Sequence, residues 1–346
     1  MGHHLTMNDI ARRARVSVAT VSRVLAGSPK VRDETRQRVL GIVRAEQYEP
    51  SQIARSLSTR KTHTVGVVID DIANPFFMEL AKGVETVVRE KGYTMLLTSS
   101  DWDEEREGEL LRTLVRNRVD GALIAAVSPD SGSTPLLRRA GIPFVLMNCW
   151  SPDDSVSYVA GDSVAGGRLA AECLLQTKVR QFLCLVGVPH QSSEERAKGF
   201  AAAIHAAGRG EALRVHRDVR TFEDGYRIVR RLLALHRIDS IETGIFTSND
   251  FVAMGVVDAL LDHRIRVPEQ VSVIGYDNIG FAERYRVPLT TVDQPKQTMG
   301  ELAAAELIRS IEEHDYRGKK LMLKPRLVVR ETCRSPIEAT ELSYTR

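Results

Sequence analysis

The sequence has no long hydrophobic run, no export signal and no closely spaced cysteine pair. Because no run of about 18 apolar residues occurs, we expect no membrane-spanning helix. No signal-peptide pattern precedes the first predicted helix. The four cysteines are scattered and form no C-x-x-C pair, which favours core thiols in a reducing compartment: Cys149, Cys173, Cys184 and Cys333. We therefore predict a cytoplasmic protein.

Motifs of the common enzyme classes are also missing. The chain contains no G-x-G-x-x-G and no G-x-x-x-x-G-K-[ST] loop for nucleotide phosphates. It has no G-x-S-x-G nucleophile elbow and no His/Cys cluster with metal-ligand spacing. The many Asp and Glu residues are spread over predicted helix faces. These absences argue against an enzyme, and we expect no cofactor and no metal.

Charge is distributed unevenly along the 346 residues. The net charge is only +3, but residues 1–62 hold 12 Lys/Arg against 5 Asp/Glu, while the rest holds 36 against 40. A basic head on a mildly acidic body is typical of a nucleic-acid-binding module, because Lys and Arg displace counterions from phosphates. A merely solvated basic face would not explain why the excess is confined to one end. The length suits a small head and a two-lobed body.

The basic head begins with two short predicted helices. Thr6 is placed to cap the first one, and Asp9 can reach back to the Thr6 amide as in a capping box. Ile10 and Ala14 share the inner face of this helix. Ser17 caps the second, which places its remaining polar and small side chains outward. Hydroxyls, methyl groups and one arginine on a short exposed helix suit the DNA major groove, although an ordinary helical hairpin has the same pattern.

A third predicted helix opens at 31–39 and carries Val39, Ile42 and Val43 as its apolar stripe. With it, the stretch 6–57 resembles the DNA-binding headpiece and hinge of the LacI/GalR family of transcription regulators, whose run Val-Ser-x-x-Thr-Val-Ser-Arg-Val is present at 16–24. Two positions depart from the family. Arg15 replaces the usual turn glycine and must tolerate a left-handed backbone or reshape the turn, and Ser51 replaces the usual hinge asparagine.

The linker 50–62 carries a short helix pattern instead of a flexible Gly/Ser composition. Seven or eight residues are too few to hold a helix alone in water, so we expect it to fold when two copies pair on DNA. The resemblance implies that Leu57 enters the minor groove, whereas the residues alone favour a core leucine. By the resemblance, the candidate DNA-contacting residues are Thr6, Ser17, Val18, Ala19, Thr20, Ser22, Arg23, Ala54 and Leu57. Among these we expect Val18, Ala19 and Arg23 to read bases, and Thr6, Thr20 and Ser22 to contact phosphate.

From residue 64 onward, short apolar strands alternate with amphipathic helices. We expect strands near 65–69, 94–97, 121–126, 143–147, 158–159, 182–186, 244–247 and 271–275. Helices are expected near 77–92, 105–119, 165–176, 197–207, 225–235 and 251–263. Continuous apolar strands joined by helices predict parallel sheets covered on both faces, and two such series predict two lobes with a cleft between them.

This half of the chain resembles the family too, whose regulatory body is built like periplasmic sugar-binding proteins. Matching segments include 70–77, 119–121, 247–250, 275–278, 288–292 and 327–331. The expected fold is a helix-turn-helix headpiece followed by a two-lobed α/β domain with parallel sheets. The expected domains are a headpiece at 1–49, a hinge at 50–62 and a body at 63–346. Within the body, one lobe takes 63–161 and 293–322, and the other takes 162–292 and 323–346.

In open parallel sheets, ligands bind beyond the carboxyl ends of the strands, where several polar residues of this sequence fall. By the resemblance, the candidate effector-contacting residues are Asp70, Phe76, Phe77, Asn148, His190, Ser192, Arg196, Phe222, Asn249 and Asp277. Aromatic faces would pack on a ring, and an arginine would hold an oxygen or an acidic group. The alternatives are structural: Asn249 as a helix cap only, Phe76 and Phe77 as core residues, and Arg196 as one half of an internal ion pair.

We therefore predict an effector-responsive DNA-binding regulator, most simply a repressor, that binds a pseudo-palindromic operator as a homodimer. Sugars, sugar acids and nucleobases all fit an aromatic and polar cleft. A periplasmic-type solute-binding protein is the alternative, against which the basic head and the missing export signal argue. No long heptad run follows Arg330, which favours dimers over tetramers.

Overall fold

The computed structural model describes residues 6–25, 27–46, 61–125, 133–187, 190–238, 242–314 and 317–333. The chain divides into two compact units, Met1–Thr62 and His63–Arg346, and each is described by itself.

The described residues of the first unit form three helices, α1 (Met7–Ala14), α2 (Val18–Leu25) and α3 (Asp33–Ala45). Each contributes apolar side chains to one small core, whose fully buried members are Ile10, Ala11, Ala14, Val21, Val24 and Val39. The inward spacing predicted for α1 and α2 is confirmed. The residues predicted for the hinge, including Ala54 and Leu57, lie outside the part of the chain that the structure describes.

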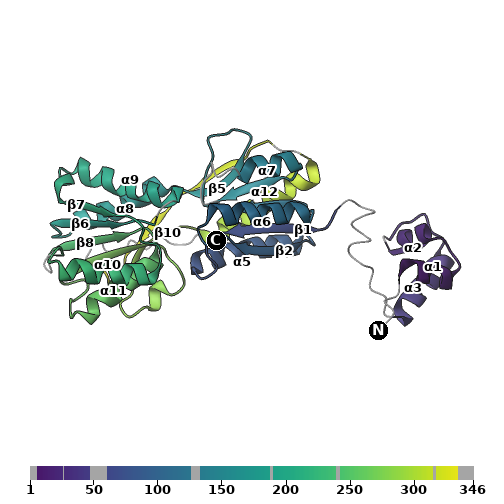
Figure 1. Cartoon of the computed structure of the whole chain (residues 1–346), viewed down its shortest axis with the longest axis horizontal. Coiled ribbons are helices and arrows are strands. Elements are labelled where there is room, and N and C mark those ends of the chain that lie inside the picture. The colour runs from purple at the N-terminus through teal and green to yellow at the C-terminus, as the bar shows by residue number, and fades with distance from the viewer. Residues whose placement is uncertain are drawn as a thin grey trace, which may run out of the picture. The chain divides into compact units, whose positions relative to one another are not determined.

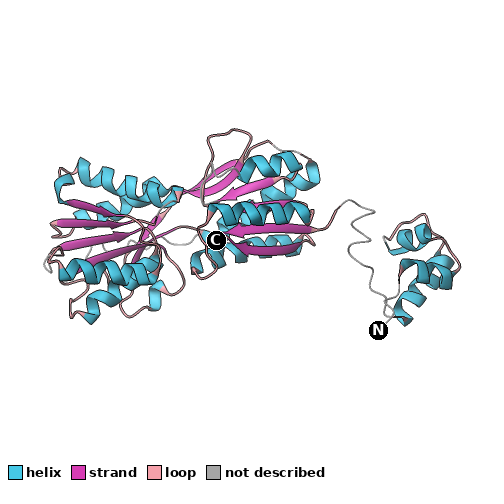
Figure 2. Cartoon of the chain, viewed as in Figure 1, coloured by secondary structure: helices cyan, strands magenta, loops and turns pink. Residues whose placement is uncertain are grey.

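The second unit is built on two six-stranded sheets (Figures 1 and 2). The first sheet has the order β11-β5-β4-β3-β1-β2, formed by β1 (Thr64–Ile69), β2 (Thr94–Ser99), β3 (Gly121–Ile124), β4 (Phe144–Met147), β5 (Ser157–Gly161) and β11 (Lys320–Leu323). The second has the order β12-β10-β9-β8-β6-β7, formed by β6 (Gln181–Leu185), β7 (Leu213–His216), β8 (Thr243–Thr247), β9 (Val271–Asp277), β10 (Thr290–Asp293) and β12 (Arg326–Val328). All neighbouring strands are parallel except β10 and β12.

Helices cover both faces of each sheet, which explains why central strands such as β3, β8 and β9 are buried along their whole length. Beside the second sheet, α8 (Ser163–Leu175) pairs with α9 (Gln191–Ala206), and α10 (Phe222–Ala234) pairs with α11 (Asp250–Asp262); the two pairs lie on opposite faces (Figure 1). Beside the first sheet, α5 (Pro75–Glu90) packs on α12 (Lys296–Glu313), and α6 (Glu104–Arg116) packs on α7 (Ser133–Ala140).

The chain passes between the two sheets three times. It crosses after β5 into α8, returns after β10 into α12, and crosses again from β11 to β12. The amide of Asp162 in the first crossing donates to the carbonyl of Leu323 in the last, at 2.9 Å, so these two segments run side by side. Three adjacent crossings form a hinge about which the two lobes can rotate.

Several elements differ from the sequence-based expectation. The helix expected to reach residue 119 ends at Arg116, and the helix expected from 197 begins at Gln191. The sequence analysis gave no helix or strand for α7, β7, β10, α12 and β11. β7 is half exposed, and its sequence Leu-Arg-Val-His has no apolar run to reveal it.

Candidate functional site

Both ends of α1 have the local geometry that the sequence predicted. The Thr6 side chain accepts from the amide of Asp9, and the Asp9 carboxylate accepts from the amide of Thr6, which completes the predicted capping box. Arg15 ends α1 with φ 51° and ψ 48°. The arginine at the family's glycine position therefore adopts the left-handed conformation and keeps the turn, at a steric cost that a glycine would not have.

The outer face of α2 presents the side chains predicted to contact DNA. Ser17, Val18, Ala19 and Arg23 are exposed, whereas Val21 and Val24 on the opposite face are buried. Thr20 and Ser22 are partly exposed, and Thr6 at the start of α1 is exposed. The Ser17 hydroxyl accepts from the Thr20 amide at 3.2 Å, so Ser17 caps α2 as expected. The arrangement offers hydroxyls, methyl groups and one guanidinium from a single short helix.

A second group of polar side chains lies where strands of the two sheets of the second unit end. Asp70 follows β1, Asn148 follows β4, His190 follows β6, Asn249 follows β8, and Asp277 ends β9. All five are buried, with at most 7% of their surface exposed. Asn148 and Asp277 hold positive φ angles of 58° and 110°, which non-glycine residues rarely adopt.

Arg196 of α9 and Asp277 form a buried ion pair in this group, with side chains 4% and 3% exposed. One guanidinium nitrogen, Nη1, lies 3.3 Å from Oδ1 of Asp277 and donates to the Ser248 carbonyl at 2.5 Å. The guanidinium stacks 3.8 Å from the centre of the Tyr276 ring. Space for that ring depends on Gly166, where an added Cβ would lie 2.2 Å from the tyrosine oxygen. Within the described residues, Nε and Nη2 of Arg196 have no hydrogen-bond partner.

Two residues that the sequence analysis missed hold Asp277 in place. Gln294 donates to Oδ1 of Asp277 at 2.7 Å, and the Lys296 ammonium donates to the carbonyls of Asp277 and Asn278 at 2.8 Å each. Burial raises the pKa of Asp277 to about 6, although Arg196, Gln294 and Lys296 each lower it. Lys296 also lies 3.4 Å from Glu79 of α5, so it links the second sheet to a helix on the first.

Asp70, His190 and Ser192 form a second polar cluster that joins the two lobes. Nε2 of His190 lies 3.0 Å from Oδ2 of Asp70, and Nδ1 lies 2.8 Å from the Ser192 hydroxyl. The contact with Asp70 is close but not aligned as a hydrogen bond, and Oδ1 of Asp70 has no partner among the described residues. Burial raises the pKa of Asp70, and the attraction of His190 opposes that shift.

Aromatic rings form one wall beside this cluster. Phe76 and Phe77 are both 2% exposed and meet edge to face at 5.0 Å. Phe77 contacts Trp102 at 5.9 Å between ring centres, and Trp102 contacts His190 at 5.7 Å. The sequence analysis did not single out Trp102. Its positive φ of 64°, in the loop after β2, is visible only in the structure.

Trp150 makes a further link between the lobes that was not predicted. It lies in the loop after β4, and its indole nitrogen donates to Glu195 at 2.6 Å. Its backbone amide donates to the Gln191 side chain at 2.9 Å. Both acceptors belong to the first turn and a half of α9, on the second lobe. These two hydrogen bonds of Trp150 therefore connect the first lobe to the first turns of α9.

Asn249 and Phe222 have structural contacts of their own. The side-chain oxygen Oδ1 of Asn249 accepts from the Val252 amide at 2.7 Å and so caps α11, which is the structural alternative considered for this residue. Phe222 is the first residue of α10, and its ring lies 6.2 Å from that of Phe251.

The buried groups at the strand ends can bind a small polar molecule but have no arrangement for metal chemistry. The described residues contain no group of three or more His, Cys, Asp or Glu side chains that could hold a metal ion. Carboxylates, amides and a partly free guanidinium offer both acceptors and donors, beside aromatic faces. Among the described helices, none is both long and apolar enough to cross a membrane.

Comparison with known proteins identifies both halves of the chain. Residues 6–51 match the model of bacterial regulatory proteins of the lacI family, and residues 171–333 match the model of a periplasmic binding protein-like domain. The ribose operon repressor of Escherichia coli (strain K12) is 36% identical over 330 residues, covering 94% of this chain and 98% of the relative. The HTH-type transcriptional repressor PurR of Vibrio campbellii is 33% identical over 333 residues, with the same coverage.

Solved structures give the same assignment. A LacI family transcriptional regulator from Enterococcus faecium with bound ribose is 30% identical, covers 80% of this chain and 100% of that one, and superposes with a TM-score of 0.70. The predicted family and the predicted fold class are confirmed. This chain belongs to the LacI family of bacterial regulatory proteins, as a DNA-binding transcriptional repressor with a small-molecule effector domain and without enzymatic activity.

Proposed function

We propose that this repressor binds a small, uncharged carbohydrate-like effector between its two lobes and a pseudo-palindromic operator through α2. The observation that carries the effector assignment is Arg196: a guanidinium 3% exposed that leaves two nitrogens without a partner in the described part of the chain. Burying donors unpaired is costly, so this arrangement fits a site in which a ligand oxygen supplies the missing acceptor.

The remaining groups of the cleft favour a ligand rich in hydroxyls. Asp70 and Asp277 can accept hydrogen bonds from hydroxyls, and neither carboxylate oxygen of Asp70 has a hydrogen-bond partner among the described residues. Two buried carboxylates beside one arginine disfavour an anionic ligand, because a further negative charge would meet both of them. Phe76 and Phe77 supply aromatic edges against which a sugar ring packs. Asn148, His190, Ser192, Phe222 and Asn249 complete the proposed effector contacts. That a related regulator is solved with ribose supports this class, whereas the relationship to PurR keeps a purine as the second candidate.

A thermal-shift panel tests the effector assignment. The full chain would be melted with ribose, other pentoses, hexoses, cellobiose, sugar phosphates and purine bases. A ligand present at about 100 times its dissociation constant adds about 2.7 kcal/mol to the free energy of unfolding. We expect a neutral sugar to stabilise the protein and Arg196→Ala to abolish that shift. Arg168→Ala is the matched control, since Arg168 is exposed on α8.

A shift that survives in Arg196→Ala would place the ligand elsewhere. Stabilisation by purines alone, lost in the same variant, would keep the site and change the ligand class. Stabilisation by sugar phosphates and not by the parent sugars would refute the argument from the two carboxylates.

For DNA, we propose that Val18, Ala19 and Arg23 meet base edges while Thr6, Thr20 and Ser22 contact phosphates, with Ser17 at the start of the helix. The exposure of these side chains on one face of α2 supports this division. Ala54 and Leu57 are proposed to contact the minor groove. Selection of binding sequences from a random DNA pool would test the proposed base contacts of α2. We expect an inverted repeat whose half-sites change when Val18 or Arg23 is replaced.

The same selection tests the proposed homodimer, because a two-fold protein requires a two-fold site. Sedimentation analysis of the free protein should give twice the mass of one chain. We further propose that the protein acts in the cytoplasm, where operator DNA lies. The effector would act by binding one arrangement of the lobes more tightly than another, which changes DNA affinity through the segment that joins the body to the headpiece.

A further inference from the structure

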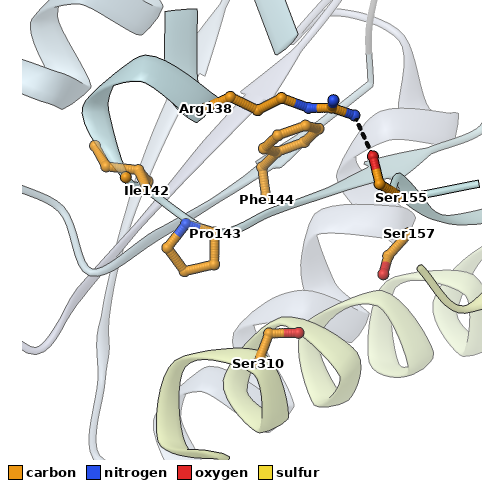
Figure 3. A pocket seen from close by; sticks show the side chains of 8 residues that line it. Arg138, Ile142, Pro143, Phe144, Ser155, Ser157 and Ser310 are labelled. Carbon is orange, nitrogen blue, oxygen red and sulfur yellow. Dashed lines mark hydrogen bonds between the residues drawn. The ribbon is translucent and has the colours of Figure 1, made fainter. Parts of the chain in front are cut away.

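A separate cavity lies in the first lobe, at the end of the sheet away from the effector cleft. Its volume is about 410 Å³, within the range of small-molecule sites. Four of its lining residues come from different elements: Arg138 from the last turn of α7, Phe144 from the start of β4, Ser157 from the start of β5, and Ser310 from α12. Figure 3 shows these side chains around one space.

The cavity is distinct from the cleft because the two lie at opposite ends of the same strands. Phe144 begins β4, and Asn148 follows its last residue. At about 3.3 Å per residue, their α-carbons are about 13 Å apart. In the proposed effector site, Asp70, Asn148 and Asp277 lie at the carboxyl ends of strands, whereas Phe144 and Ser157 are the first residues of their strands.

One wall of the cavity is apolar. Ile142, Pro143 and Phe144 lie in sequence along it, and all three are only partly buried. The Phe144 ring stands beside the extended Arg138 side chain (Figure 3). A flat or cyclic apolar group would pack against these three residues and exclude water from them.

The opposite wall carries two buried hydroxyls with unused hydrogen-bonding capacity. Ser310 is 5% exposed and donates to the Glu306 carbonyl at 3.0 Å, which leaves its oxygen as an acceptor. Ser157 is 6% exposed and accepts from the Lys319 amide at 3.0 Å. Its contact with the Glu306 carboxylate is long, at 3.5 Å, so its proton can turn to a better acceptor.

One basic side chain beside the cavity has donors available for an anion. Arg138 uses Nη2 for Asp153 at 2.6 Å and Ser155 at 2.7 Å, and no contact within the described residues engages its other two nitrogens. The buried Glu306 is balanced by Arg309, at 2.7 Å and 3.1 Å. Arg309 also pairs with Glu313 at 3.2 Å, so the basic and acidic groups beside the cavity balance, and the two unengaged nitrogens of Arg138 are the donors available to an anion.

We propose that this cavity is a second ligand site, which binds a small aromatic or alicyclic carboxylate. The ring lies against Pro143 and Phe144. The carboxylate accepts from the free guanidinium nitrogens of Arg138 and from the Ser157 hydroxyl, as charge-assisted bonds. This inference does not depend on the effector proposed for the cleft.

Benzoate and cyclohexanecarboxylate are the probes, titrated into the full chain by calorimetry, with benzyl alcohol as the neutral analogue. We expect both carboxylates to bind and benzyl alcohol to bind about tenfold more weakly or not at all. Ser310→Leu fills the cavity and should abolish binding. Arg138→Gln should weaken it about tenfold, while Arg139→Gln, an exposed neighbour that does not line the cavity, should leave it unchanged.

Binding must also persist in Arg196→Ala, because that residue belongs to the cleft. The proposal is overturned if neither carboxylate binds, if Arg196→Ala abolishes binding, or if Ser310→Leu folds and binds as the wild type does. Should Ser310→Leu fail to fold, the pair Arg138→Gln and Arg139→Gln decides: equal affinities would refute the site.

Discussion

Replacing Asp277 by Asn should change how the stability of the protein depends on pH. In the folded chain Asp277 is 2% exposed, and its burial raises its pKa to about 6 from the ordinary 3.8. A carboxyl group whose pKa is raised by folding stabilises the fold when protonated. Its contribution is fully present below the unfolded value and is lost as the pH rises through the folded value.

The size of the effect follows from those two pKa values. Between about pH 5 and about pH 7.5 the wild type should lose about 1.4 kcal/mol of unfolding free energy through Asp277 alone. Asn resembles the protonated acid in size and charge and does not titrate, so the variant should lack this loss. Other groups titrate in both proteins, and their contributions cancel in the difference.

Urea denaturation of both proteins at the two pH values measures this difference. Asp154→Asn is the matched control, because the Asp154 side chain is 99% exposed; it should follow the wild type at both pH values. If Asp277→Asn also followed the wild type, Asp277 would not titrate in the folded protein over this range, and the argument from its burial would be wrong. A bound ligand that donates to the carboxylate should lower its pKa, so effector affinity should rise over the same interval.

Four further substitutions test other parts of the structure. Arg23→Ala should cost about 1–3 kcal/mol on the selected DNA site and relax base preference there, as measured by fluorescence anisotropy; equal weakening on all sequences would assign Arg23 to phosphate. Arg15→Gly should stabilise the headpiece by about 0.5–1 kcal/mol, because it removes the steric cost of the left-handed backbone at Arg15, which exceeds the added entropy of the unfolded chain. Slower amide exchange in α1 would show this stabilisation, and faster exchange would contradict it. Trp150→Phe keeps an aromatic ring but removes the donor to Glu195, so it should weaken effector binding about tenfold in calorimetry. Glu195→Gln should have the same effect to a smaller extent. Unchanged affinity would show that this contact does not hold the lobes together.

The features that could be predicted from sequence depend on neighbours along the chain. The capping box of Thr6 and Asp9 spans three residues, and the left-handed Arg15 follows from a turn whose length is fixed by the two helices around it. The apolar strands were evident because burial on both faces leaves no polar positions. β7 was not predicted for the opposite reason: it is an edge strand that is half exposed, so its sequence has no apolar run.

The contacts of the cleft could be predicted only in part, because they join residues far apart in the sequence. Strand ends indicated Asp70, His190 and Asp277, but nothing local marks Gln294 or Trp150 as their companions. Trp150 meets Glu195 across the two lobes, 45 positions away. Such pairs depend on how the lobes close, which no local pattern encodes.

The central claim is that a ligand held at Arg196 and Asp277 controls DNA binding. The most direct test is the affinity of the full chain for its selected DNA site, measured with and without the stabilising ligand, in the wild type and in Asp277→Ala. We predict that the ligand changes the affinity of the wild type, and that the variant binds DNA equally well but no longer responds. A variant that folds, binds the site and still responds to the ligand as the wild type does would contradict the account.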